Sequence, residues 1–163
     1  MAVTNNITAQ HNCAINVDTN SILADKNLDA FIIMLDKPGF VTFTDNNRLP
    51  QFIKQQLYCL TTDSFSIADR DEAYKCCCTS AKDLPKRQLL FFSINSNHLL
   101  ITYLTGGIGV STTILMLKFD KEKILDIWAG KAFPKFASKK EVIEHIKALR
   151  KKGNELHGGY VSI

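Results

Sequence analysis

The chain has 163 residues, of which 45% are hydrophobic and 22% are charged, and its formal net charge is +4. This balance is typical of an ordinary globular protein and excludes an intrinsically disordered chain. A chain of this length buries enough surface to fold without a metal ion or a disulfide, and it contains no run of about 18 apolar residues, so we expect no membrane span.

The positive charge is mild and is concentrated in one region. Between residues 131 and 152 lysines alternate with apolar residues in helical register. Nucleic-acid-binding proteins gather basic residues on one face, whereas this pattern is typical of the solvated side of a helix. We therefore expect no nucleic-acid partner.

The first 27 residues are rich in Asn and Thr, with apolar residues scattered singly. We interpret residues 1–27 as an N-terminal arm or irregular segment and residues 28–163 as a single domain. The start lacks the charged and apolar regions of a secretory signal. Two locations remain open: the cytoplasm, or the periplasm or exterior for a protein whose signal has been removed. The polar start favours the second.

The next elements follow from apolar spacing. Four apolar residues at helical spacing predict a helix from the N-cap Asn27 to Leu35, ended by Pro38 and Gly39. Residues 40–44 predict a strand, and a second helix begins near Pro50, which suits a first helical turn. Residues 61–86 have no clear period.

A run of β-forming segments predicts the main sheet. The connections between these segments are short and rich in turn residues, so consecutive strands must pair in antiparallel fashion. The segments are residues 88–94, 98–104, 110–119 and 124–128.

The C-terminal helix has the strongest local pattern. Ser138 and Glu141 form a capping box, and Gly153 is placed to end the helix in a left-handed turn. Residues 160–163 are a candidate edge strand. The predicted fold is α+β: an antiparallel β-meander of about four to six strands packed against two or three helices.

Five cysteines are many for this length. Cys13 and Cys59 stand alone, and Cys76, Cys77 and Cys78 are consecutive. All five are disulfide candidates, because in an oxidising compartment either lone cysteine has three potential partners; buried or idle thiols are the alternative. Adjacent cysteines fit a tetrahedral zinc ion poorly, so we expect no metal site and no cofactor.

The glycine-rich loop at Gly106, Gly107 and Gly109 resembles a phosphate-binding loop only in composition. Such loops precede a helix whose free N–H groups face the anion, but a strand pattern follows here. We predict a hairpin turn, whose glycines would also let a partner approach the backbone.

Large aromatic residues mark the meander, and most are expected in the core. Tyr103 and Trp128 each stand next to a predicted turn. We therefore expect these two, together with the three loop glycines, to be the residues that contact a partner.

No motif for catalysis is present, and none of the four histidines has a second ligand at metal spacing. We expect a non-catalytic domain that binds another protein, such as a small bacterial immunity or inhibitor protein. Two alternatives remain. One is an enzyme that pairs His98 with Cys59 or a cysteine from 76–78; the other is a domain with a small-molecule pocket between helices and sheet.

Overall fold

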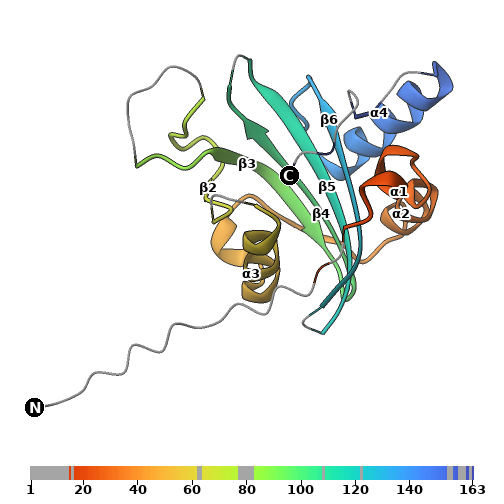
Figure 1. Cartoon of the computed structure of the whole chain (residues 1–163), viewed down its shortest axis with the longest axis horizontal. Coiled ribbons are helices and arrows are strands. Elements are labelled where there is room, and N and C mark those ends of the chain that lie inside the picture. The colour runs from red at the N-terminus through yellow and green to blue at the C-terminus, as the bar shows by residue number, and fades with distance from the viewer. Residues whose placement is uncertain are drawn as a thin grey trace, which may run out of the picture.

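Four consecutive strands form the centre of the molecule, as the sequence predicts. The computed structural model describes residues 15, 17–61, 64–76, 83–107, 109–121, 123–153, 156, 157, 161 and 163. In this part of the chain four α-helices cover both faces of a six-stranded sheet (Figure 1). The predicted α+β class and the antiparallel meander are therefore confirmed.

The meander lies in one continuous sheet. Its strands pair in chain order, β3 with β4, β4 with β5 and β5 with β6, and all three pairings are antiparallel. Two short strands add to β3, β1 in antiparallel and β2 in parallel orientation. The strands are β1 Val41–Phe43, β2 Ile67–Ala68, β3 Arg87–Ile94, β4 His98–Thr105, β5 Ser111–Asp120 and β6 Lys123–Ala132.

The order β1-β3-β4-β5-β6 places β6 at one edge of the sheet. This strand continues to Ala132, beyond the predicted end at residue 128. Trp128 consequently lies in the middle of a strand and not beside a turn.

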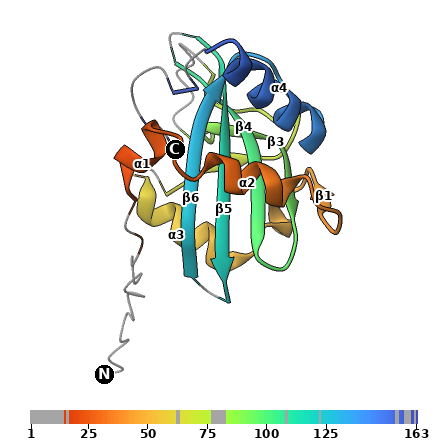
Figure 2. The same cartoon turned by 90° about the vertical axis from the view of Figure 1, so that its right-hand side faces the viewer.

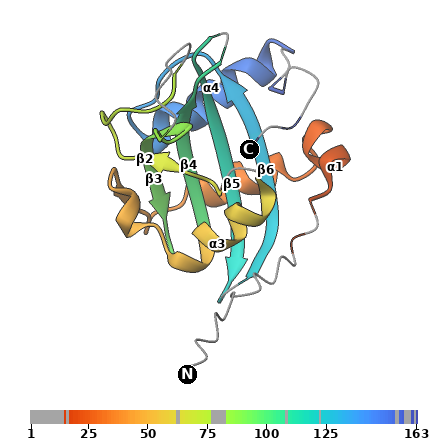
Figure 3. The same cartoon turned by 60° about the vertical axis from the view of Figure 1, so that its left-hand side comes forward.

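The helices form two layers. Figure 2 shows α1, α2 and α4 on one face of the sheet, with α2 passing across the strands, and Figure 3 shows α3 on the opposite face. Their bounds are α1 Thr19–Leu23, α2 Leu28–Leu35, α3 Gln51–Leu60 and α4 Lys139–Lys151, and a 3-10 turn spans Asn46–Arg48. The predicted apolar face of α2 is buried: Leu28, Phe31, Ile32 and Leu35.

The domain begins earlier than residue 28. Asp18 caps α1 by accepting a hydrogen bond from the backbone N–H of Ser21 at 3.1 Å, and Ile22 is 1% exposed in the core. The prediction of an irregular segment over residues 1–27 is therefore wrong for Thr19–Leu23, which form α1. A five-residue helix with one buried side chain is too short to show a period. Residues 1–14 and 16 lie outside the described part.

The capping of α4 is confirmed. The Ser138 hydroxyl accepts from the backbone N–H of Glu141 at 3.3 Å, the Glu141 carboxylate accepts from the backbone N–H of Ala137 at 3.0 Å, and Gly153 adopts a φ of +68° after the helix. Lys147 of α4 also pairs with Asp36 at 3.0 Å. This ion pair joins α4 to the end of α2.

None of the helices among the described residues is long and apolar enough to cross a membrane.

Candidate functional site

Three charged or polar residues form a row across three neighbouring strands. His98 at the start of β4 lies opposite Lys118 of β5, and Lys118 lies opposite Asp126 of β6. Directly opposed residues of antiparallel strands point to the same face of a sheet, with Cβ atoms about 5 Å apart. The face is the one that α2 covers, since Phe31 of α2 packs edge-on against the His98 ring.

Asp126 is held in place by the turn that leads into α2. Its Oδ1 atom accepts from the side-chain amide of Asn27 at 2.7 Å and from the backbone N–H of Ile127 at 2.9 Å. The same Asn27 amide group donates to the carbonyl oxygen of Ile127 at 3.0 Å. The sequence suggested that the Asn27 side chain caps α2, but it forms no capping hydrogen bond. It joins the start of the helix to the edge strand β6 instead.

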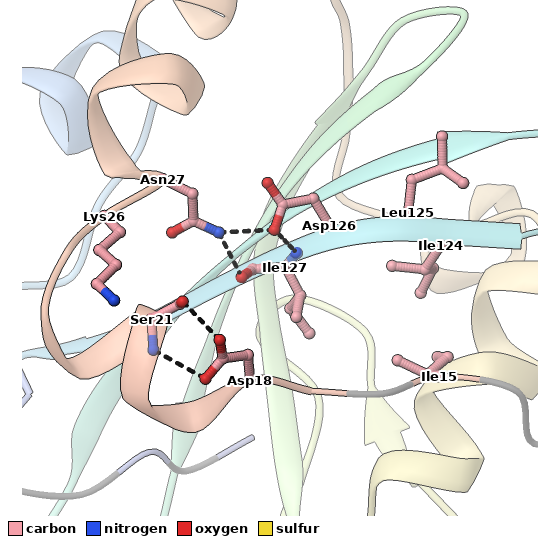
Figure 4. A pocket seen from close by; sticks show the side chains of 9 residues that line it. All are labelled: Ile15, Asp18, Ser21, Lys26, Asn27, Ile124, Leu125, Asp126 and Ile127. Carbon is pink, nitrogen blue, oxygen red and sulfur yellow. Dashed lines mark hydrogen bonds between the residues drawn. The ribbon is translucent and has the colours of Figure 1, made fainter.

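A groove of about 330 Å³ lies beside this junction (Figure 4). One wall comes from α1 and the α1–α2 turn, and the other comes from β6. Apolar side chains and charged groups both line it: Ile15, Asp18, Ser21, Lys26, Asn27, Ile124, Leu125, Asp126 and Ile127.

A β-bulge shapes the β6 wall of the groove. Lys118 pairs with Asp126 and the next residue, Phe119, pairs with Ile124, so Leu125 has no cross-strand partner. Its side chain is 59% exposed. Bulges re-aim side chains at sheet edges and are common beside functional sites, and here the bulge places an apolar side chain in a groove at the edge of the sheet.

The groove contains an unsatisfied hydrogen-bond acceptor. The Oδ1 atom of Asn27 is buried, and no described residue donates a hydrogen bond to it. Figure 4 shows this oxygen turned away from Asp126. A buried polar atom without a partner costs free energy.

A second cavity, of about 220 Å³, lies between α2 and the sheet. Asp126 lines this cavity as well as the groove. The remaining lining residues are three apolar or small residues of α2, Ala30, Phe31 and Met34, and three polar residues, Asn97, His98 and Lys118.

The turn before β4 fixes His98 in this cavity. The side-chain oxygen of Asn95 accepts from the backbone N–H of His98 at 2.7 Å, and the Oδ1 atom of Asn97 lies 2.7 Å from Nδ1 of His98. Because a side-chain carbonyl oxygen only accepts, Nδ1 carries the proton and the neutral ring presents a lone pair at Nε2. No described residue hydrogen-bonds to Nε2.

His98 is 4% exposed. Burial lowers the pKa of its imidazole below the ordinary value, and the positive charges of Lys118 and Lys37 lower this pKa further. The ring is therefore neutral near pH 7, and Nε2 acts as a hydrogen-bond acceptor.

The arrangement is suited to binding by hydrogen bonds. Three hydrogen-bond acceptors in the lining have no donor among the described residues: Oδ1 of Asn27, the second carboxylate oxygen of Asp126 and Nε2 of His98. Lys26 supplies positive charge at the groove, and Lys118 supplies it at the second cavity. The Ser21 hydroxyl donates to its neighbour Asp18 at 2.7 Å. In the described part of the chain, no three His, Cys, Asp or Glu residues are grouped to hold a metal ion.

Tyr103 and Trp128 do not present a surface to a partner. Both side chains are 0% exposed. The Phe65 ring packs edge-on against Tyr103 at 5.6 Å, on the α3 side of the sheet. Trp128 lies over Gly130, where an added Cβ would come within 2.3 Å of the indole. The prediction that these two aromatics contact a partner is corrected: both belong to the core.

The glycine-rich loop is the tip of the β4–β5 hairpin, as predicted. The backbone that approaches it belongs to the same chain: Gly107 donates to the carbonyl oxygen of Cys76 at 2.7 Å, and a Cβ on Gly106 would come within 1.9 Å of that oxygen. Among the described residues, none beyond its chain neighbours lies within 4 Å of the Cβ position of Gly109. A role of the three glycines in binding a partner stays a prediction.

The structure describes two of the five cysteines, Cys59 and Cys76, and does not join these two to each other. The other three disulfide candidates lie outside the described residues: Cys13, Cys77 and Cys78. The disulfide therefore stays a prediction.

The suggested pairing of His98 with a cysteine is not formed by the described residues. Cys59 lies on α3, which covers the opposite face of the sheet from His98 (Figures 2 and 3). Cys76 contacts the hairpin tip, which lies at the opposite end of β4 from His98. The two ends of this eight-residue strand are roughly 23 Å apart.

Sequence reasoning missed the residues that line the two cavities. Asn27 was assigned to a helix cap and Asp126 to a strand without a role, and His98 was considered only with a cysteine. The available signal was polar residues within otherwise apolar strands, at positions 118 and 126. Comparisons of the chain with protein-family models, with curated proteins and with solved structures found no match.

Proposed function

We propose that this chain is a non-catalytic binding domain that holds an extended segment of a partner protein in the groove between α1 and the bulged edge of β6. The groove differs from the predicted interface, since its lining includes none of the five residues that the sequence analysis expected to contact a partner. The supporting observation is a 330 Å³ groove whose lining combines an exposed apolar side chain, charged groups of both signs and an asparagine with an unsatisfied acceptor.

The mixture of groups favours a protein partner. Interfaces combine apolar and polar contacts, and here the groove is lined by apolar residues, Ile15, Ile124 and Leu125, beside the charged residues Asp18, Lys26 and Asp126 (Figure 4). The groove carries both negative and positive side chains, which disfavours a partner whose surface is uniformly charged, such as a nucleic acid.

The open oxygen of Asp126 favours an extended segment. A peptide chain carries one backbone N–H at nearly every residue, so a strand-like segment in the groove brings donors to the open oxygen of Asp126. Ordinary β-strand addition is disfavoured, because Asn27 and Asp126 already bond the backbone of Ile127 and because the bulge interrupts the edge.

The test is selection of short peptides from a display library on the wild-type chain, followed by affinity measurement by fluorescence anisotropy. Leu125→Glu places a charge in the groove, and the exposed, unpaired position should tolerate it without loss of fold. We expect this variant to bind the selected peptides at least about tenfold more weakly, which corresponds to ~1.4 kcal/mol.

Phe133→Glu is the matched control. Phe133 is 91% exposed and follows the opposite end of β6, so the same apolar-to-acidic change should alter affinity by less than about twofold. Peptides that bind Leu125→Glu as tightly as the wild type, or that lose affinity only with Phe133→Glu, contradict the proposed site.

A further inference from the structure

The cavity beneath α2 presents an acceptor and a donor at neighbouring positions. Nε2 of His98 offers a lone pair that no described residue uses. The ammonium group of Lys118, directly opposite on β5, donates hydrogen bonds and accepts none. Lys118 is exposed and forms no ion pair with a described residue, although Asp126 lies opposite it.

A hydroxyl group satisfies both positions at once. It donates one hydrogen bond and accepts others through the same oxygen atom. A carboxylate only accepts and leaves Nε2 unsatisfied, while an ammonium group only donates and is repelled by Lys118. The neighbouring pair of His98 and Lys118 therefore selects a hydroxyl over either charged group.

The residues that line the cavity favour a particular chemical group as the carrier of this hydroxyl. Phe31, Met34 and Ala30 of α2 line one side. Aromatic rings pack favourably against another ring edge and against a thioether sulfur. The 220 Å³ of space, about the volume of seven water molecules, has room for a phenol ring.

We propose that this cavity receives a tyrosine side chain of the partner segment, whose phenolic oxygen donates to Nε2 of His98 and accepts from Nζ of Lys118. The inference rests on the proposed function, because the tyrosine would belong to the segment that lies in the adjoining groove. The link between the two is Asp126, which lines both cavities.

The first experiment uses p-cresol, the side chain of tyrosine, as a probe of the wild-type protein. NMR titration should show shifts of the His98 ring nitrogens and of Phe31. Toluene lacks the hydroxyl and benzoate carries a carboxylate, so both should bind at least about tenfold more weakly than p-cresol. Equal affinity of toluene, or tighter binding of benzoate, would overturn the assignment.

Two variants locate the site. Lys118→Met removes the hydrogen-bond donor from an exposed position, and His98→Phe removes the acceptor but keeps an aromatic ring. Each variant should bind p-cresol at least about tenfold more weakly than the wild type. His145→Phe is the matched control, since His145 is also partly buried and lies on α4 outside the cavity. Unchanged p-cresol affinity in Lys118→Met contradicts the proposal even if His98→Phe does not fold.

The peptides selected on the wild-type chain separate this inference from the proposed function. We expect them to contain a tyrosine whose change to phenylalanine lowers affinity at least about tenfold. Peptides that depend on Leu125 but on no tyrosine leave the groove assignment standing and overturn the tyrosine pocket. Binding of p-cresol without a tyrosine requirement in any peptide also overturns it, in favour of a free phenolic ligand.

Discussion

At the scale of single residues, Asp25 holds together two parts of the fold that are far apart in sequence. Its Oδ1 atom accepts from the indole nitrogen of Trp128 at 2.9 Å and lies 2.8 Å from Nε2 of His157. The Trp128 and His157 rings pack edge-on with centroids 5.3 Å apart. The carboxylate thus joins the α1–α2 turn, β6 and the C-terminal tail.

Asp25→Ala should destabilise the fold by about 2–4 kcal/mol, because two buried donors lose their partner and because alanine disfavours the φ of +52° at this position. Urea unfolding measures the change. Asp36→Ala is the matched control: it removes an exposed carboxylate that pairs with Lys147 and should cost less than about 1 kcal/mol. Equal losses in the two variants would contradict this role of Asp25.

At the scale of elements, the β4–β5 hairpin is joined to the segment that contains Cys76. The Cβ of Gly106→Ala would meet the Cys76 carbonyl oxygen at 1.9 Å, so one backbone must move. We expect a loss of about 1–3 kcal/mol in the free energy of unfolding.

Gly109→Ala tests the same loop without the clash, because no non-neighbouring residue in the described part of the chain lies within 4 Å of its Cβ position. This change should shift stability by less than about 0.5 kcal/mol. Thermal unfolding of both variants compares them directly. A Gly106→Ala protein as stable as Gly109→Ala would show that the contact with Cys76 does not hold the hairpin.

The elements that could be predicted are those with a local pattern. The apolar spacing of α2, the capping box of α4 and the turn residues between strands each act over a few neighbouring residues. The end of β6 was missed because Ala129 and Gly130 are poor strand formers, although Gly130 is required by the Trp128 indole.

The candidate site could not be predicted from such patterns. His98, Lys118 and Asp126 share one face only because three strands pair in a particular register, and a slip of one residue would turn a strand's side chains to the opposite face. The bulge at Leu125 changes the register again within β6. The spacing of residues in the sequence predicts neither the register of these strands nor the position of the bulge.

At the scale of the whole molecule, buried histidines make stability depend on pH. Burial lowers the pKa of His98 and of His145 below the ordinary value. The unfolded chain therefore binds protons more readily than the folded chain, and stability falls as the pH decreases below about 6.5.

Urea unfolding at pH 7.0 and at pH 5.5 should show lower stability at the acidic value. One histidine contributes a slope of at most about 1.4 kcal/mol per pH unit, and His98→Phe should flatten the decline. Stability that rises on acidification to pH 5.5 would contradict the burial of neutral rings.

The central claim is that the groove around Asp126 is the binding surface of this protein. Hydrogen exchange of the wild-type chain, with and without a selected peptide, tests it most directly. The account predicts slower exchange at residues 21–31 and 124–127 when the peptide is bound, with no change at the hairpin tip. Slower exchange at residues 106–110 and 133, with the groove unchanged, would contradict it.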